Sequence, residues 1–372
     1  MKARGWGKRN LTKRLCQRGF DKKISYTDNN KITEVALLRL PWNGNQINMN
    51  AVVRRLPLLI LSVAGIWSAQ VTHAQSVATN PVGYNMYTLP VGNSLRVNTF
   101  VQATVFQGTA SAVTNSGSSV ITLSSSATAL TSGSFNEVNG EPTCYVEILD
   151  SGTAQGLIAD IVSNGTNTIT VDTNLISFGV SPTCSFLVRP HTTLASLFPP
   201  TSGLTAYVDT IQLFPPTGPV QGYTFTGSTS DGWGGSGNQI IYPGQGFEIT
   251  VQTAKTVAVT GYVKPGQTQI PLYAGAVNVV GTINPVISGT QTLSSFAFPA
   301  VFSAYVDSVQ TYVDNGSLQI SGAFLSNGSN MITSGTAGNF DTLPLSNPSN
   351  AVIVSVQQSK NWIIPSFYTS GN

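Results

Sequence analysis

The chain has 372 residues, of which 9% are charged and 41% are hydrophobic, and its formal net charge is +3. Of the 18 Lys and Arg, 13 lie in residues 1–74, so residues 75–372 hold five against 12 Asp and Glu, a net charge of −7. Nucleic acids and anionic membrane surfaces are captured by clustered Lys and Arg. This charge distribution therefore excludes both partners for residues 75–372.

Residues 1–48 contain 11 of the basic residues and show no apolar periodicity. Two interpretations stay open for them. They are a non-native N-terminal extension upstream of a natural start at Met49, or they are an extended export leader. We favour the first, because a signal peptide that follows such a leader would begin unusually far from the N-terminus.

Residues 49–74 have the composition of a secretory signal peptide. Arg54 and Arg55 precede an apolar run, Leu56 to Ala69, and Thr72-His73-Ala74 supplies a small-x-small cleavage pattern. A basic start, a short apolar core and a small-residue exit are the three parts of such a signal. The run is also shorter than the roughly 20 apolar residues of a membrane span. We expect cleavage after Ala74, no integral membrane span in the mature chain, and a secreted or cell-surface protein.

The remainder of the chain has the composition of an all-β protein, rich in Gly, Ser, Thr, Asn and Val and poor in helix-favouring residues. Asn164-Gly165 stands between two β-branched runs, 157–162 and 168–171, which is the strongest short-range hairpin signal. Runs at 120–123 and 144–149 are also typical of strands. The same turn signal recurs as Asn139-Gly140, Asn315-Gly316 and Asn327-Gly328.

An internal repeat organises this β region. Residues 204–212 recur as residues 302–310 at an offset of 98, and residues 249–255 recur as 354–360 at an offset of 105. A fainter similarity relates residues 82–84 to 260–262. The pattern predicts two related β-sandwich or barrel-like modules. Their predicted bounds are 75–255, with a β-rich insertion at about 101–198, and 256–372.

The first repeated segment places Tyr207 and Asp209 at equivalent positions to Tyr305 and Asp307. If both segments are strands, each aspartate shares a face with its tyrosine. A carboxylate used twice would suit a ligand or metal site, but a structural carboxylate that caps a turn or lies at an edge is the interpretation we favour. Duplicated modules repeat structural residues as readily as functional ones.

Cys144 and Cys184 each follow a Pro-Thr pair and open a β-like run. In an exported chain, two cysteines are most simply a disulfide. The alternative is a pair of buried free thiols. Cys16, the third cysteine, lies upstream of the predicted signal peptide.

The residues that carry catalysis are scarce. His191 is the single histidine of residues 75–372 and stands beside Pro190, so it is expected in a solvated loop rather than in a Ser-His-Asp triad or a zinc site. No phosphate-binding Gly-Lys-Ser/Thr motif occurs. We expect no enzyme, cofactor or metal. A glycosidase needs two carboxylates, and this alternative stays open on Glu137, Glu141, Glu147 and Asp150.

Four aromatic residues are candidate ligand platforms, because an exposed ring can stack on a sugar. Trp233 stands in a glycine-rich loop, where a buried anchor fits equally well, and the others are Tyr223, Trp362 and Tyr368.

Three short segments carry a resemblance to a family. These are Ala78 to Tyr84, the Pro-Gly-Gln-Gly-Phe step at 243–247, and Gly275 to Pro285. They resemble an uncharacterised family of exported, β-rich proteins that is numerous in Verrucomicrobia. The last segment departs from the family pattern at Thr282 to Asn284. The resemblance implies export and a β-repeat fold, and it implies no activity.

Two function classes follow for the exported chain. The first is a non-enzymatic structural or surface-assembly protein that associates with itself, because strand edges can add to a neighbouring sheet. The second is an extracellular module that binds polysaccharide or a surface partner through exposed aromatic residues.

Overall fold

The structure is a computed structural model that describes residues 23–28, 31–36, 82–115, 117–125, 127–150, 152–283, 292–293, 297–333 and 349–365. The chain forms two compact units, Met1–Val77 and Ala78–Asn372. In the first unit, β1 (Lys23–Asp28) and β2 (Lys31–Ala36) form an antiparallel hairpin. The predicted signal peptide, residues 49–74, lies outside the described residues.

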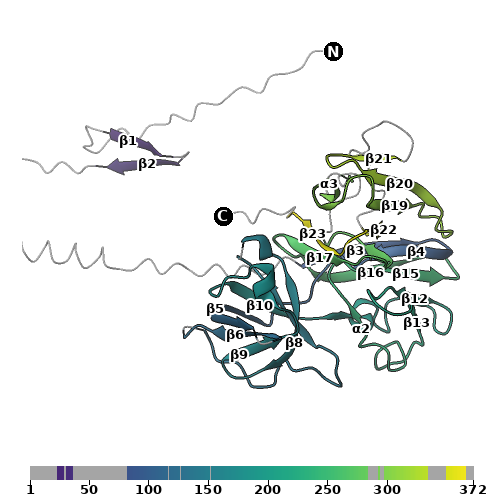
Figure 1. Cartoon of the computed structure of the whole chain (residues 1–372), viewed down its shortest axis with the longest axis horizontal. Coiled ribbons are helices and arrows are strands. Elements are labelled where there is room, and N and C mark those ends of the chain that lie inside the picture. The colour runs from purple at the N-terminus through teal and green to yellow at the C-terminus, as the bar shows by residue number, and fades with distance from the viewer. Residues whose placement is uncertain are drawn as a thin grey trace, which may run out of the picture. The chain divides into compact units, whose positions relative to one another are not determined.

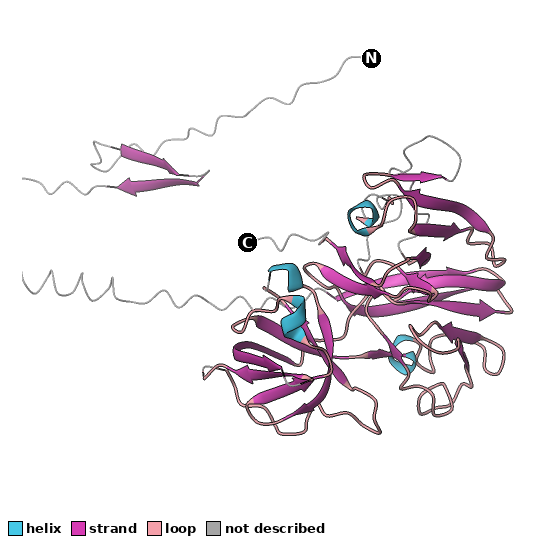
Figure 2. Ribbon diagram, viewed as in Figure 1, coloured by secondary structure: helices cyan, strands magenta, loops and turns pink. Residues whose placement is uncertain are grey.

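The second unit is built almost entirely from β-strands (Figure 2), which confirms the predicted all-β fold. Its described helices are single turns: η1 (Gly152–Ala154), η2 (Leu175–Phe178), α2 (Leu194–Leu197) and α3 (Phe298–Val301). Across the described ranges, no helix combines the length and the apolar character that a membrane crossing requires.

Six strands close into a barrel in the order β10-β5-β6-β9-β8-β7. Their bounds are β5 (Phe106–Asn115), β6 (Ser119–Leu123), β7 (Cys144–Ile148), β8 (Ile158–Asn164), β9 (Thr168–Val171) and β10 (Ser185–Pro190). The predicted Asn164-Gly165 hairpin joins β8 to β9. All six strands fall inside residues 101–198, the predicted insertion, and Figure 1 shows them grouped apart from the other sheets.

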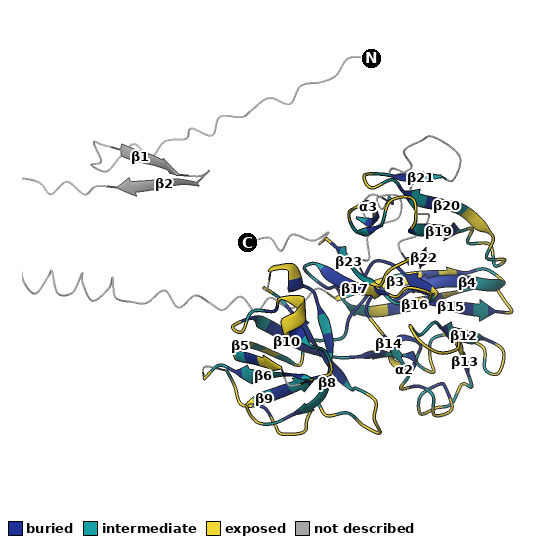
Figure 3. Ribbon diagram, viewed as in Figure 1, coloured by how far each residue is buried: buried dark blue, intermediate teal, exposed yellow. Residues whose placement is uncertain are grey.

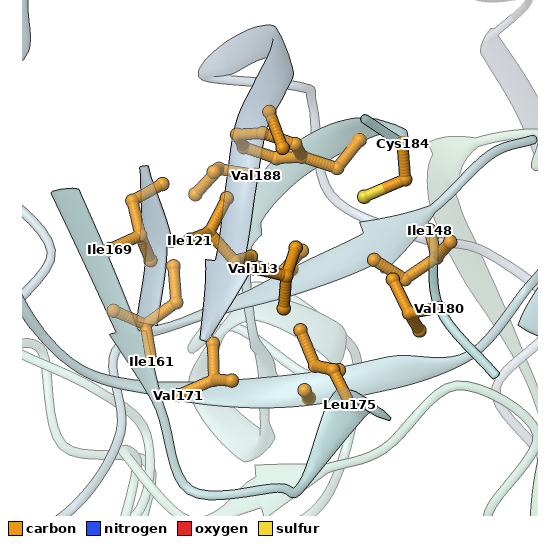
Figure 4. Close-up of a cluster of buried hydrophobic side chains, with 14 of the residues drawn as sticks. Val113, Ile121, Ile148, Ile161, Ile169, Val171, Leu175, Val180, Cys184 and Val188 are labelled. Carbon is orange, nitrogen blue, oxygen red and sulfur yellow. The ribbon is translucent and has the colours of Figure 1, made fainter. Parts of the chain in front are cut away.

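The barrel interior is aliphatic because alternate residues of its strands point inward. Burial alternates regularly along β6 and β9. Figure 4 shows Ile121, Ile161, Ile169 and Val188 converging on one another inside the barrel, and all four are fully buried. These contacts form a core separate from those of the other sheets.

A four-stranded antiparallel sheet, in the order β13-β12-β15-β4, forms the first half of the remaining structure. Its strands are β4 (Gly92–Val97), β12 (Thr210–Leu213), β13 (Gln221–Thr224) and β15 (Gly246–Val251). Two pairs of strands accompany it: β3 (Val82–Leu89) with β16 (Lys255–Tyr262), and β11 (Thr192–Thr193) with β14 (Ile240–Ile241). Tyr87, Phe198 and Phe247 pack in the core of this half.

The second half contains a five-stranded sheet in the order β18-β22-β19-β20-β21 and a strand pair, β17–β23. The bounds are β17 (Thr268–Leu272), β18 (Asn278–Val280), β19 (Ser308–Tyr312), β20 (Ile320–Ser326), β21 (Met331–Thr333), β22 (Val352–Ser355) and β23 (Lys360–Ile364). Figure 3 shows most of the strands in both halves as buried or partly buried, with exposed residues gathered in the loops.

The strand orders of the two halves correspond. The sheet β13-β12-β15-β4 matches β20-β19-β22-β18, and the pair β16–β3 matches β23–β17. Because β16 pairs along its whole length with β3, it belongs to the first half. The boundary between the halves therefore lies after Tyr262, and not between residues 255 and 256 as the sequence predicts. Residues 82–84 and 260–262 are cross-strand partners within one half, so their similarity is no part of the repeat.

The two halves meet at β4. Arg96 is buried there, with Nη2 2.8 Å from Oδ1 of Asp314, and its Nη1 donates to Asn350 Oδ1 at 2.8 Å. Gly316 has a φ of +85°, and its carbonyl accepts a hydrogen bond from the Asn93 amide at 2.8 Å. A Cβ there would lie 1.8 Å from the Val91 carbonyl oxygen, so only glycine fits this contact.

Candidate functional site

Tyr207 and Tyr305 lie in matching turns that precede β12 and β19. Both have a φ of +60°, in the left-handed region. The Tyr207 amide donates to the Phe225 carbonyl and the Tyr305 amide to the Ser326 carbonyl, each at 2.6 Å. The expectation that these tyrosines lie in strands, on the same face as the aspartates, is therefore wrong. A left-handed residue breaks the two-residue alternation on which that expectation rested.

A buried carboxylate fixes each turn. Asp209 Oδ2 accepts the Thr205 amide and Asp307 Oδ2 accepts the Ser303 amide, both at 2.7 Å. Lys255 pairs with Asp209, and Lys360 pairs with Asp307 at 2.5 Å. Both aspartates are completely buried. Their role in this geometry is structural, as favoured from the sequence, since each one holds a turn and neutralises a lysine.

The tyrosine rings themselves contribute little to folding. Tyr207 is 78% exposed and Tyr305 is 68% exposed. A left-handed conformation costs a bulky side chain roughly 1–2 kcal/mol, and glycine would avoid that cost. Both halves therefore hold a ring in solvent at an energetic cost, and such backbone strain points to function.

Two of the predicted aromatic platforms are core residues. Trp233 is 2% exposed, donates Nε1–H to the Phe198 carbonyl at 3.1 Å and packs edge-on against Phe225. Trp362 is fully buried and stacks on Phe298 with ring centroids 4.5 Å apart. Their prediction as exposed platforms is wrong, because large apolar rings contribute most when they leave water.

The other two platforms differ from these. Tyr223 is half-buried, and its hydroxyl donates to Gln239 Oε1 at 2.9 Å. Tyr368 lies outside the described residues.

The glycine-rich loop that carries Trp233 is organised by Asp231. The Asp231 carboxylate accepts hydrogen bonds from four backbone amides, those of Trp233, Gly234, Gly235 and Gly237.

Cys144 and Cys184 are separate buried thiols in the barrel core, so the predicted disulfide is wrong. The strand register gives the reason. Cys144 lies opposite Pro190 in the β7–β10 pair, and Cys184 precedes the other end of β10. Six residues of strand separate the two positions, roughly 20 Å at about 3.3 Å per residue, whereas a disulfide needs Cα atoms within about 7 Å.

The outer surface of the barrel carries a row of polar residues. Arg189, Tyr145 and Asp160 are cross-strand neighbours on β10, β7 and β8. Glu147 lies two residues along β7 from Tyr145 and therefore on the same face. Strand register alone brings these residues together. Because they are far apart in the sequence, no local sequence pattern predicts that they are neighbours.

A buried ion cluster joins this barrel surface to the β16–β17 connection. Glu147 Oε1 lies 2.7 Å from Lys264 Nζ, and its Oε2 lies 3.2 Å from Arg189 Nε. The three side chains are at most 2% exposed. Gln267 and Gln269 add hydrogen bonds to the carbonyl of Gln155 at 2.9 and 3.0 Å. A buried ion contact thus holds the barrel here, with Glu147 bound to both cations and Nη2 of Arg189 left without a hydrogen-bond partner.

His191 is buried and not in a solvated loop, which corrects the expectation for it. Its ring lies between those of Tyr145 and Tyr242, with centroids 5.1 and 5.2 Å away. Its Nε2 is 3.2 Å from Asp160 Oδ1 without hydrogen-bond geometry, and neither ring nitrogen has a hydrogen-bond partner. Tyr242 donates its hydroxyl to Asp160 Oδ2 at 2.6 Å.

Three tyrosines interact electrostatically with three carboxylates in this part of the fold. Burial, and then the charge of Asp160, raise the pKa of Tyr242, and Asp172 and Glu141 raise it further. Burial followed by Asp172 and Asp160 raises the pKa of Tyr273, and burial followed by Glu141 raises that of Tyr223. We call this set the tyrosine–carboxylate surface: Tyr223, Tyr242, Tyr273, Glu141, Asp160 and Asp172.

Comparisons with protein-family models, with curated proteins and with solved structures find no match for this chain. The resemblance to a Verrucomicrobia family therefore stays a prediction. Among the described residues, no group of three or more His, Cys, Asp or Glu side chains is arranged to hold a metal ion.

Proposed function

We propose that the protein is an exported, non-enzymatic structural or surface-assembly protein that associates through the exposed Tyr207 and Tyr305 turns. The single observation that carries the proposal is the pair of strained, exposed tyrosines, each braced by a buried Asp–Lys pair. Export is proposed from the signal-like composition of residues 49–74.

The shape of the two turns favours a protein neighbour as their partner. Each turn presents a tyrosine followed by an exposed valine, Val208 or Val306. Exposed apolar residues on a projecting turn insert into a partner surface, and tyrosine is among the residues that dominate binding energy at protein interfaces. The charges of Asp209 and Asp307 within the turns are neutralised by Lys255 and Lys360. Contacts of this kind depend on burial of the rings and are insensitive to salt.

Internal duplication supports the same proposal. The recurrence of the segment around Tyr207, the matching strand orders and the matching turn hydrogen bonds are consistent with two copies of one module, the first carrying the barrel as an insertion. Two equivalent contact points on one chain allow each molecule to engage two neighbours, which produces filaments or layers rather than closed pairs.

The test is the size distribution of the purified protein without residues 1–74, measured by sedimentation velocity and negative-stain microscopy. We expect concentration-dependent polymers that the double variant Tyr207→Ser, Tyr305→Ser abolishes. Tyr84→Ser is the matched control, because Tyr84 is 73% exposed on the ordinary strand β3. A monomeric parent protein, or equal loss in the control, contradicts the proposal. Mass analysis of the exported chain tests cleavage after Ala74.

A second candidate function is an extracellular binding module for polysaccharide or a surface partner. The observation that favours it is the partly exposed Tyr242, which donates its hydroxyl to Asp160 and lies in the electrostatic range of Asp172 and Glu141, with Tyr223, one of the predicted platforms, also in the range of Glu141. Loss of ligand binding with intact self-association would separate the two candidates.

A further inference from the structure

Among the described residues, no Lys or Arg forms an ion pair with the tyrosine–carboxylate surface, and His191 is the one basic side chain in contact with it, at Asp160. Residues 75–372 contain five Lys and Arg in total. All five pair with carboxylates outside this surface: Arg96 with Asp314, Lys255 with Asp209, Lys360 with Asp307, and both Arg189 and Lys264 with Glu147. Glu141, Asp160 and Asp172 therefore have no Lys or Arg of this segment as a partner.

Two of these carboxylates are held close together. The Asp160 amide donates to Asp172 Oδ1 at 3.2 Å, and Thr173 Oγ1 donates to the same oxygen at 2.8 Å. Burial, together with the charge of Asp160, raises the pKa of Asp172. The negative charges thus repel one another across a small area, and an external cation would relieve that repulsion.

A second and independent observation comes from the buried side of the same site. His191 is directed at Asp160 and is 4% exposed, yet neither of its ring nitrogens forms a hydrogen bond. The hydroxyl of Tyr145, packed against the same ring, is buried and also has no hydrogen-bond partner. Buried polar groups are normally paired, so the surroundings of Asp160 retain unused hydrogen-bonding capacity.

The aromatic rings narrow the class of ligand. Tyr242, which donates its hydroxyl to Asp160, is 39% exposed, and Tyr273, whose pKa responds to Asp172 and Asp160, is 37% exposed. A hydrated metal ion gains nothing from such rings, whereas an ammonium group is attracted both to carboxylates and to aromatic faces. A sugar ring additionally stacks on exposed aromatic residues.

We infer that the tyrosine–carboxylate surface binds an amino-sugar oligosaccharide, with its ammonium groups at Asp160 and Asp172 and its sugar rings against Tyr242 and Tyr273. The inference deepens the second candidate function, on which it rests, and is independent of the assembly proposal.

Isothermal titration calorimetry with a tetramer of β-1,4-linked glucosamine tests the inference, and the neutral N-acetylated tetramer is the chemical control. We expect binding to the charged tetramer alone, weakening as salt is raised. Asp172→Asn keeps the Oδ1 acceptor and removes the charge, so we expect roughly fivefold weaker binding. Tyr273→Leu should weaken binding to a similar extent by removing the ring.

Glu248→Gln is the matched control variant, because it removes one negative charge on β15, outside this surface, and its affinity should equal that of the parent protein. Circular dichroism and the size distribution are recorded for every variant. No binding of the charged tetramer, equal binding of the neutral tetramer, or full affinity in both Asp172→Asn and Tyr273→Leu overturns the inference. None of these results bears on self-association, which is measured separately.

Discussion

Single carboxylates decide how the turns of this protein are built. Asp307 accepts amides from Ser303 and Gln357 and pairs with Lys360. Burial by itself would raise the pKa of Asp307, but the Lys360 hydrogen bond and the two backbone amides outweigh burial and lower it. A group with a lowered folded-state pKa stabilises the fold fully above its unfolded value, about 4, and that contribution disappears as pH falls through the folded value.

The variant Asp307→Asn tests this directly. At pH 7 we expect a loss of roughly 2–3 kcal/mol in the free energy of unfolding, because Lys360 loses its anion and a buried charge pair is broken. Below pH 4 the difference between variant and parent should shrink, because the parent also loses the ionised carboxylate. Urea unfolding of both proteins at several pH values from 7 to 2.5 measures this difference in the free energy of unfolding. Two parallel pH profiles would contradict the assignment.

The two barrel thiols give a second prediction at this scale. Burial, and then the charge of Asp150, raise the pKa of the Cys184 thiol to about 11, and burial raises that of Cys144. Thiolate is the reactive form, so the native protein should react with iodoacetamide only slowly at pH 8. In urea, without reductant, two thiols per chain should be labelled in the protein lacking residues 1–74. If no thiol is labelled under those conditions, Cys144 and Cys184 form a disulfide after all.

At the scale of elements, each of the turns before β12 and β19 keeps a tyrosine ring exposed at a cost in folding stability. Tyr207→Gly removes roughly 1–2 kcal/mol of left-handed strain, and the added freedom of the unfolded chain offsets about 0.5–1 kcal/mol of this gain. We therefore expect the free energy of unfolding to be unchanged or raised by up to about 1 kcal/mol. Tyr84→Gly on β3 should instead lose about 1 kcal/mol, because glycine weakens a strand. Thermal unfolding of both variants decides the matter, and a clear loss in Tyr207→Gly would show that the ring stabilises the fold.

At the scale of the whole molecule, the attachment of the barrel depends on the buried cluster of Glu147, Arg189 and Lys264. Lys264→Met removes one of the two cations and the 2.7 Å contact to Glu147. We expect a loss of about 3–5 kcal/mol, the usual result of breaking a buried ion pair. Replacing all three residues by Met should restore most of the stability, because no buried charge is then left unpaired. Equal stability of Lys264→Met and the parent protein in urea would contradict a structural role for the cluster.

Local chemistry was sufficient to predict the strand-rich fold, the Asn164-Gly165 hairpin and the extra strands within residues 101–198. β-Branched residues and Asn-Gly turns act over a few residues, so their effect can be read from the chain itself. The aromatic platforms were predicted less well, because whether Trp233 or Trp362 is exposed depends on neighbours far away in sequence. The Cys144–Cys184 pairing failed for the same reason, since strand register determines the distance between two cysteines.

What the sequence by itself determined about this protein is its β character, the charge of each segment and the recurrence of the segment around Tyr207. Tertiary structure decided that Tyr207 and Tyr305 take a left-handed backbone, because their amides donate to the carbonyls of Phe225 and Ser326, which are distant in sequence, and because tyrosine itself does not prefer that conformation. It also decided that Asp160, His191 and Tyr242 meet. They come from β8 and from connections far apart in the chain, and packing the barrel against the sheets is what brings their charges and rings together.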